Sequence, residues 1–114
     1  MKLWIDDVRP APDGYLWCQT VDHAKSIIRL WEVNRETDDL NIPIMMLHHG
    51  RQIELIDMDH DAGDYAHLGG DYIKLLDWLE EIGLGYPIRI HSQNPVGVAN
   101  MRAIIERNGW KEVF

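Results

Sequence analysis

The chain has 114 residues, a formal net charge of −8, a hydrophobic content of 46% and one cysteine, Cys18. This hydrophobic content excludes an intrinsically disordered chain, and the length predicts a single domain over residues 1–114. The acidic charge argues against an extended nucleic-acid surface and against an anionic membrane as partners. Neither a signal peptide nor a long apolar run is present, and one cysteine permits no internal disulfide. We therefore expect a soluble, cytoplasmic protein.

The N-terminal part predicts two short strands joined without a helix. Lys2–Ile5 is nearly continuous in apolar character, as in a central strand, and it ends at Asp6-Asp7. Prolines and Asp13-Gly14 then predict a turn in place of the usual long helix. Tyr15–Cys18 follows as a second strand, and we expect Cys18 to be a core residue.

A helix is predicted next, from an N-cap at Thr20 to about Asn34, because apolar residues recur on one helical face. These residues are Ala24, Ile27, Ile28 and Trp31.

Two apolar runs, 42–47 and 51–56, then flank His48-His49-Gly50, which predicts a β-hairpin. The alternative is an irregular segment packed by its methionines. We interpret His48 and His49 as exposed turn residues, because adjacent strand side chains point to opposite faces.

The second half of the chain alternates further strands and helices. A strand ending at Ile56 runs into the stretch DMDHDAG (57–63), and a polar loop, 64–70, precedes a helix that starts at Asp71 and stops near Gly83. Pro87–Ile90 is the next strand. Asn94 and Pro95 then predict the cap and first residue of a helix to about Asn108, and 111–114 a short last strand. This order predicts an α/β three-layer sandwich with a mostly parallel sheet, a reduced first helix and a possible extra hairpin.

Acidic residues follow two of the predicted strands. In open α/β sheets, ligands bind beyond the carboxyl ends of the strands, so we expect Asp6, Asp7 and Asp59 to converge. Crowded carboxylates favour a hard divalent cation, and this predicts a site for Mg²⁺ or Mn²⁺. The alternative is that Asp6 and Asp7 cap loop amides or pair with Arg9.

Two histidines lie at the same predicted strand ends. His60 and His91 are candidate proton donors and acceptors for hydrolysis of a phosphodiester, and Asp59 is a candidate for metal or phosphoryl chemistry. Each histidine alone is equally explained by a structural bond to an Asp. The candidate phosphate contacts are Arg9, Ser92 and Asn94. A plain N-cap role explains Asn94 without a ligand.

Three motifs together carry a resemblance that covers nearly the whole chain. KLWIDDVRPAP, DMDHDAG and PIRIHSQNPVGVANM resemble the cyclic-phosphate-processing receiver domain family, which is related to response-regulator receivers. The resemblance implies a flavodoxin-like receiver fold, with Asp6, Asp7 and Asp59 at the metal and phospho-acceptor positions. It also implies that His60 and His91 match histidines that ordinary receivers lack, and that the substrate is a cyclic phosphate on a small nucleotide or RNA end.

The sequence thus predicts a phosphoesterase, with two alternatives. The first is a divergent receiver that acts as a non-catalytic regulatory or binding module. Receivers carry a lysine at the end of their fifth strand, whereas Lys111 would begin that strand here, and this argues against phosphoaspartyl signalling. More distantly, Asp57-x-Asp59 resembles the paired aspartates of haloacid-dehalogenase-like phosphatases. The roles of Asp57 and Asp61 are not assigned by the sequence.

Overall fold

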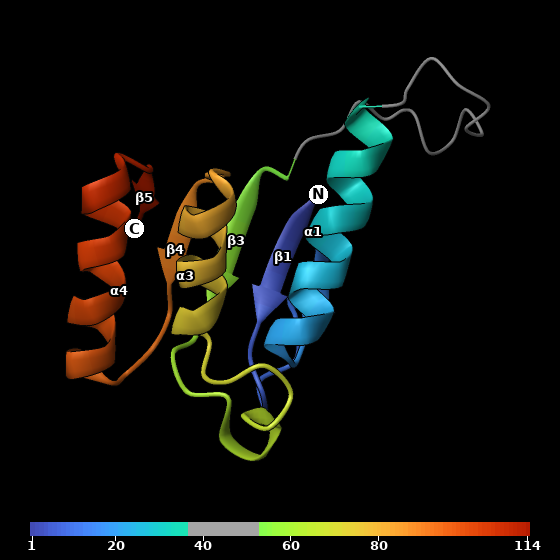
Figure 1. Cartoon of the computed structure of the whole chain (residues 1–114). Coiled ribbons are helices and arrows are strands. Elements are labelled where there is room, and N and C mark those ends of the chain that lie inside the picture. Colours follow the sequence, from blue (N-terminus) through green and yellow to red (C-terminus); the bar gives the residue numbers. More distant parts are fainter. Residues whose placement is uncertain (37–52) are drawn as a thin grey trace.

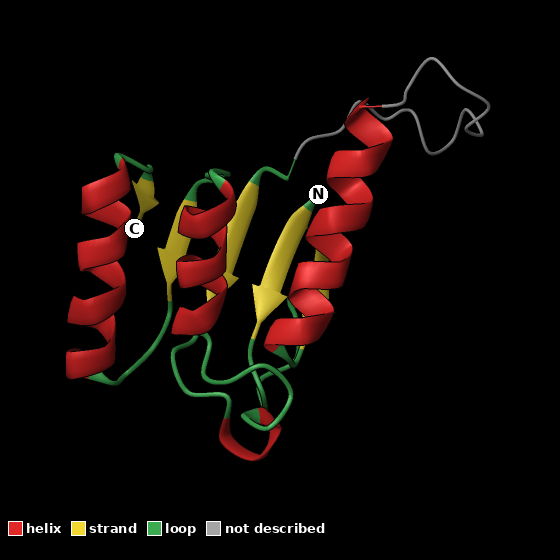
Figure 2. Cartoon of the chain, in the orientation of Figure 1, coloured by secondary structure: helices red, strands yellow, loops and turns green. Residues whose placement is uncertain are grey.

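The computed structural model describes residues 1–36 and 53–114. Its elements, in chain order, are β1 (Lys2–Ile5), β2 (Tyr15–Cys18), α1 (Val21–Glu36), β3 (Leu55–Met58), the 3-10 helix η1 (Gly63–Tyr65), α3 (Ile73–Ile82), β4 (Ile88–Ile90), α4 (Pro95–Asn108) and β5 (Glu112–Val113). Figure 1 shows their arrangement, and Figure 2 shows the same view by secondary structure. The elements confirm a receiver-like, flavodoxin-like α/β fold.

The five strands form one parallel sheet in the order β2-β1-β3-β4-β5. Alternate residues of each strand point to opposite faces of this sheet. On one face Leu3, Ile5, Ile56 and Met58 are fully buried in the core together with side chains of the helices. On the other face Trp4, Asp57 and Arg89 stand side by side, because their strands pair in this register.

The helices α1, α3 and α4 cover a single face of the sheet (Figure 1). Each helix connects two strands, and all three connections run in the same direction along the strand order. Right-handed crossovers therefore place the three helices on the same side of the sheet. Only the step from β1 back to β2 runs the other way, and residues 6–14 make it without a helix. The missing first helix is therefore confirmed, and the described residues form two of the three predicted layers.

Local sequence signals set most of the helix ends as predicted. The Thr20 hydroxyl accepts a hydrogen bond from the His23 amide before α1, and Asn94 caps α4 by accepting from the Gly97 amide. Gly83 ends α3 in the left-handed conformation. Helix α3 begins at Ile73, two residues later than predicted, because the Asp71 carboxylate accepts from the Ala62 amide instead of capping the helix.

The third strand differs from its prediction. It spans Leu55–Met58, so Asp57 is a residue of β3, fully buried, and does not follow the strand. Apolar character alone ended the predicted strand at Ile56, because an Asp is rarely buried unless it has partners. The proposed hairpin, with His48 and His49, lies almost entirely outside the described residues.

Two further expectations concern Cys18 and membranes. Cys18 is buried, and this burial raises the pKa of its thiol to about 11, as fits a core residue. Among the described helices, none combines the length and apolar character that a membrane span requires.

Candidate active site

The ends of three neighbouring strands meet at one edge of the sheet. Backbone pairing continues one residue beyond the strands, since the Asp59 amide donates to Ile5 O (2.9 Å) and the His91 amide to Met58 O (2.9 Å). Oxygens of Asp6, Asp7 and Asp59 lie within 4.8 Å of one another. Residues predicted from two distant motifs are thus brought together in a single acidic cluster.

Asp6 is fully buried and held on both oxygens. Its Oδ1 accepts from the amides of Val8 (2.9 Å) and Arg9 (2.8 Å), and its Oδ2 lies 2.8 Å from His91 Nε2. Burial raises the pKa of Asp6, but these backbone amides and His91 outweigh it and lower the pKa below its usual value. Asp6 therefore carries a negative charge in the interior. It caps loop amides, as the alternative reading expected, and it also belongs to the acidic cluster.

Asp7 is the member of the cluster whose charged form is disfavoured by its surroundings. Burial raises the pKa of Asp7, and the charges of Asp6 and Asp59 raise it further. Gly63 packs directly against the Asp7 carboxylate. A Cβ on Gly63 would lie 2.4 Å from Asp7 Oδ2, and its φ of +55° also favours glycine.

Two tryptophans fix the loop that carries the first two acids. The indole N–H of Trp4 donates to Arg9 O (2.8 Å), and that of Trp17 donates to Asp6 O (2.8 Å). The two residues pair across β1 and β2 and therefore share a face of the sheet. The sequence prediction did not assign them a role, although a half-buried indole N–H usually finds an acceptor.

Tyr72 and Gln19 are linked to the acidic cluster by hydrogen bonds. The Tyr72 hydroxyl donates to Gln19 O (2.7 Å), and Gln19 Nε2 donates to Asp7 O (3.2 Å). Burial raises the pKa of Tyr72, and the three carboxylates raise it further. The sequence patterns did not indicate Tyr72 as a residue of this site.

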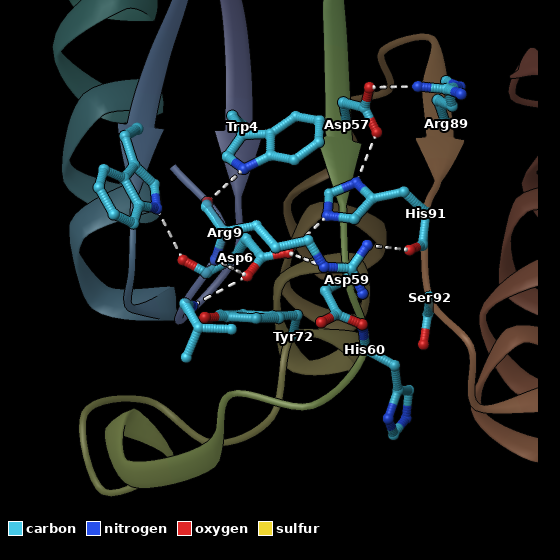
Figure 3. A network of polar contacts seen from close by, with 12 residues as sticks. Trp4, Asp6, Arg9, Asp57, Asp59, His60, Tyr72, Arg89, His91 and Ser92 are labelled. Carbon is cyan, nitrogen blue, oxygen red and sulfur yellow. Dashed lines mark hydrogen bonds and ion pairs between the residues drawn. The ribbon is translucent and has the colours of Figure 1, made fainter. Parts of the chain in front are cut away.

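His91 is turned into the protein. Its Nδ1 lies 2.7 Å from Asp57 Oδ1 and its Nε2 2.8 Å from Asp6 Oδ2 (Figure 3). A neutral imidazole has a single N–H, so serving two carboxylates requires a second proton on the ring or a proton on one carboxyl. Both ring nitrogens contact carboxylates of the protein, so His91 can contact a ligand only when one of these two contacts is broken.

His60 points in a different direction from His91. Figure 3 shows the two rings on opposite sides of Asp59. The His60 ring lies on Gly97 in the first turn of α4, since a Cβ there would be 2.5 Å from His60 Cγ. Its Nδ1 lies 2.7 Å from Asp61 Oδ1. Donation from Nδ1 to this carboxylate leaves Nε2 as the basic nitrogen.

The predicted phosphate contacts are partly engaged with the protein. Arg9 donates from Nη1 to His91 O (3.3 Å), and its Nε is 3.7 Å from Asp6 Oδ2, with 46% of the side chain exposed. Ser92 Oγ accepts from the Asn94 amide (3.1 Å), and its own hydrogen can still be donated. The Asn94 side chain caps α4 and contacts Asp61, which supports the N-cap reading.

The acidic cluster fits a divalent cation. It offers hard oxygen ligands from three carboxylates, and burial, together with the charges of Asp6 and Asp59, raises the pKa of Asp7. Lys111 precedes β5, at the opposite edge of the sheet from the acids, so β5 supplies no lysine to this site. The cluster therefore has the acids of a receiver without the fifth-strand lysine.

Comparisons with known proteins identify the family of this chain. A comparison with curated proteins and with solved structures found no match. The family model described as "Cyclic-phosphate processing Receiver domain" matches residues 1–107. This match includes strands β1, β2, β3 and β4 and every residue of the site just described. The chain belongs to the cyclic-phosphate processing receiver domain family.

Proposed function

We propose that the protein hydrolyses a cyclic phosphate on a small nucleotide or on an RNA end, with a divalent metal ion held by Asp6, Asp7 and Asp59. The convergence of these carboxylates within 4.8 Å, in a member of a family associated with cyclic-phosphate processing, is the observation that carries the proposal. When bound, Mg²⁺ or Mn²⁺ would neutralise phosphate charge and polarise a phosphoryl oxygen. We expect the reaction to take place in the cytoplasm.

Hydrolysis of a cyclic phosphate forms one bond from water oxygen to phosphorus and breaks one phosphorus–oxygen ester bond. The water proton passes to a base, and an acid returns a proton to the departing oxygen, which gives a phosphomonoester and a free hydroxyl. His60 is the stronger candidate for this transfer, because Asp61 holds its Nδ1 and leaves Nε2 as the reactive atom. His91 would take part through Nε2 only after this nitrogen releases Asp6, since Asp57 holds its Nδ1 in the interior.

Arg9 and Ser92 are the proposed phosphate contacts. The guanidinium lies beside the acidic cluster and is half exposed, and guanidinium groups bind phosphate oxygens through paired donors. Ser92 follows β4 at the same edge of the sheet, and its hydroxyl would donate to a phosphoryl oxygen. Asn94 would contribute indirectly, by opening the N-terminal turn of α4.

The test is turnover of 2′,3′-cyclic and 3′,5′-cyclic nucleotides by the purified protein with Mg²⁺ or Mn²⁺. We expect ring opening that EDTA abolishes, with a loss of about 100-fold or more in Asp59→Asn and His60→Ala. His23→Ala is the matched control, because His23 is exposed on α1. Absence of turnover with all of these substrates and both metals would refute the proposal.

A non-catalytic receiver is the second candidate, and Asp59 at the end of β3 favours it. In that case an acyl-phosphate donor would label Asp59, and the Asp59→Asn variant would stay unlabelled. Labelling without turnover of any cyclic phosphate would support the regulatory module.

A further inference from the structure

Asp57 is buried, charged and outside the proposed chemistry. Among residues 1–32 and 53–114, Asp6 and Asp57 are the charged residues with no exposed surface. Asp57 lies in the middle of the sheet, on the face opposite the helices. A buried carboxylate is costly unless partners satisfy its oxygens, so its contacts indicate what it does.

The two oxygens of Asp57 have separate partners. Oδ2 accepts from Arg89 Nη1 at 3.0 Å, and Arg89 is the residue paired with Asp57 across β3 and β4. Oδ1 lies 2.7 Å from His91 Nδ1. Arg89 is 46% exposed, whereas His91 is 8% exposed, so only the contact with His91 is shielded from water.

His91 links Asp57 to the acidic cluster. Its Nε2 lies 2.8 Å from Asp6 Oδ2, its amide donates to Met58 O, and its ring is stacked on Trp4. The ring is thus held at both edges and on one face. Figure 3 shows the continuous series from Arg89 through Asp57 and His91 to Asp6.

We propose that Asp57 is a positioning residue for the metal site: it fixes the His91 ring, and the ring in turn fixes the Asp6 carboxylate that faces Asp7 and Asp59. Groups that hydrogen-bond to a metal's ligands orient those ligands, and their loss typically weakens metal binding about 10–100-fold. The proposal rests on the proposed metal role of Asp6. Positioning of His91 explains why Asp57 is buried in β3, which a simple ion pair with Arg89 does not explain.

The experiment compares Asp57→Ala and Asp57→Asn with Arg89→Met. The Arg89 variant removes the ion pair but leaves Asp57 bonded to His91. We expect Mn²⁺ affinity to fall about 10–100-fold in Asp57→Ala, to fall less in Asp57→Asn, which keeps one acceptor oxygen, and to stay within about 2-fold in Arg89→Met. Circular dichroism checks that each variant is folded, and Asp57→Asn carries the test if Asp57→Ala is not.

A second measurement does not depend on metal binding or turnover. The ¹⁵N signals of the His91 ring, recorded at a single pH, should shift in the Asp57 variants and stay unchanged in Arg89→Met. Wild-type affinity in a folded Asp57 variant, or equal losses in Arg89→Met, would overturn the proposal. If the wild-type protein binds no Mn²⁺, the proposed function fails, and unchanged ring signals in Asp57→Asn would separately refute the positioning role.

Discussion

The imidazole ring of His91 lies flat on the indole ring of Trp4, with ring centroids 4.0 Å apart and planes inclined by 7°. Trp4 belongs to β1 and His91 follows β4, so the imidazole crosses above β3, where Asp57 meets its Nδ1. The same indole donates to Arg9 O in the loop that carries Asp6 and Asp7. One tryptophan therefore supports both the histidine and the acidic loop.

The two indole hydrogen bonds should contribute similar amounts to stability. Trp4→Phe keeps an aromatic ring under His91 but loses the bond to Arg9 O, and Trp17→Phe loses the bond to Asp6 O. We expect each variant to lower the free energy of unfolding by about 1 kcal/mol, measured by urea denaturation. A stability equal to wild type in both variants would show that these bonds do not hold the loop.

Gly63→Ala should disturb the acidic cluster specifically. The new Cβ would lie 2.4 Å from Asp7 Oδ2, whereas Gly14, also at positive φ, has nothing within 4 Å of its Cβ. Both alanines cost about 1–2 kcal/mol of stability through the left-handed backbone. Only Gly63→Ala should also weaken Mn²⁺ binding, measured by calorimetric titration. Equal affinities in the two variants would contradict the contact between Gly63 and Asp7.

Asp7→Asn should separate the repulsion in the cluster from metal binding. Without metal, Asp7 is disfavoured as a carboxylate by burial and by Asp6 and Asp59, so the neutral variant should be at least as stable as wild type in EDTA. Wild type should gain thermal stability when Mg²⁺ is added, because a ligand of the folded state shifts the unfolding equilibrium, and the variant should not. Thermal melts with and without Mg²⁺ measure both effects. An equal gain in the variant would remove Asp7 from the site.

Glu80 should make stability depend on acid pH. Hydrogen bonds from Arg107 and Asn108 lower its pKa from 4.5 to about 2. Because the folded-state pKa lies below the unfolded one, its contribution is present above about pH 4.5 and is lost as the pH falls toward 2. The stability difference between wild type and Glu80→Gln should therefore shrink over this range. Urea denaturation at several pH values tests it, and a constant difference would contradict the lowered pKa.

Local patterns determined most of the elements. The apolar runs located β1, β2 and β4, and the capping residues Thr20 and Asn94 located α1 and α4. The chain order of strands and helices also predicted that Asp6, Asp7 and Asp59 would meet, since parallel strands end at the same edge. These features depend on residues close together in sequence, or on a general rule of topology.

The tertiary structure decided how the groups at that edge are used. Asp57 lies within β3, and the His91 ring lies between Asp57 and Asp6, whereas the His60 ring lies against Gly97 on α4. The sequence alone did not distinguish these two histidines, because each simply follows a strand and neighbours an Asp or a Ser. Their orientations depend on contacts between strands and helices far apart in the chain, on the stacking surface of Trp4, and on which carboxylates become buried beside them.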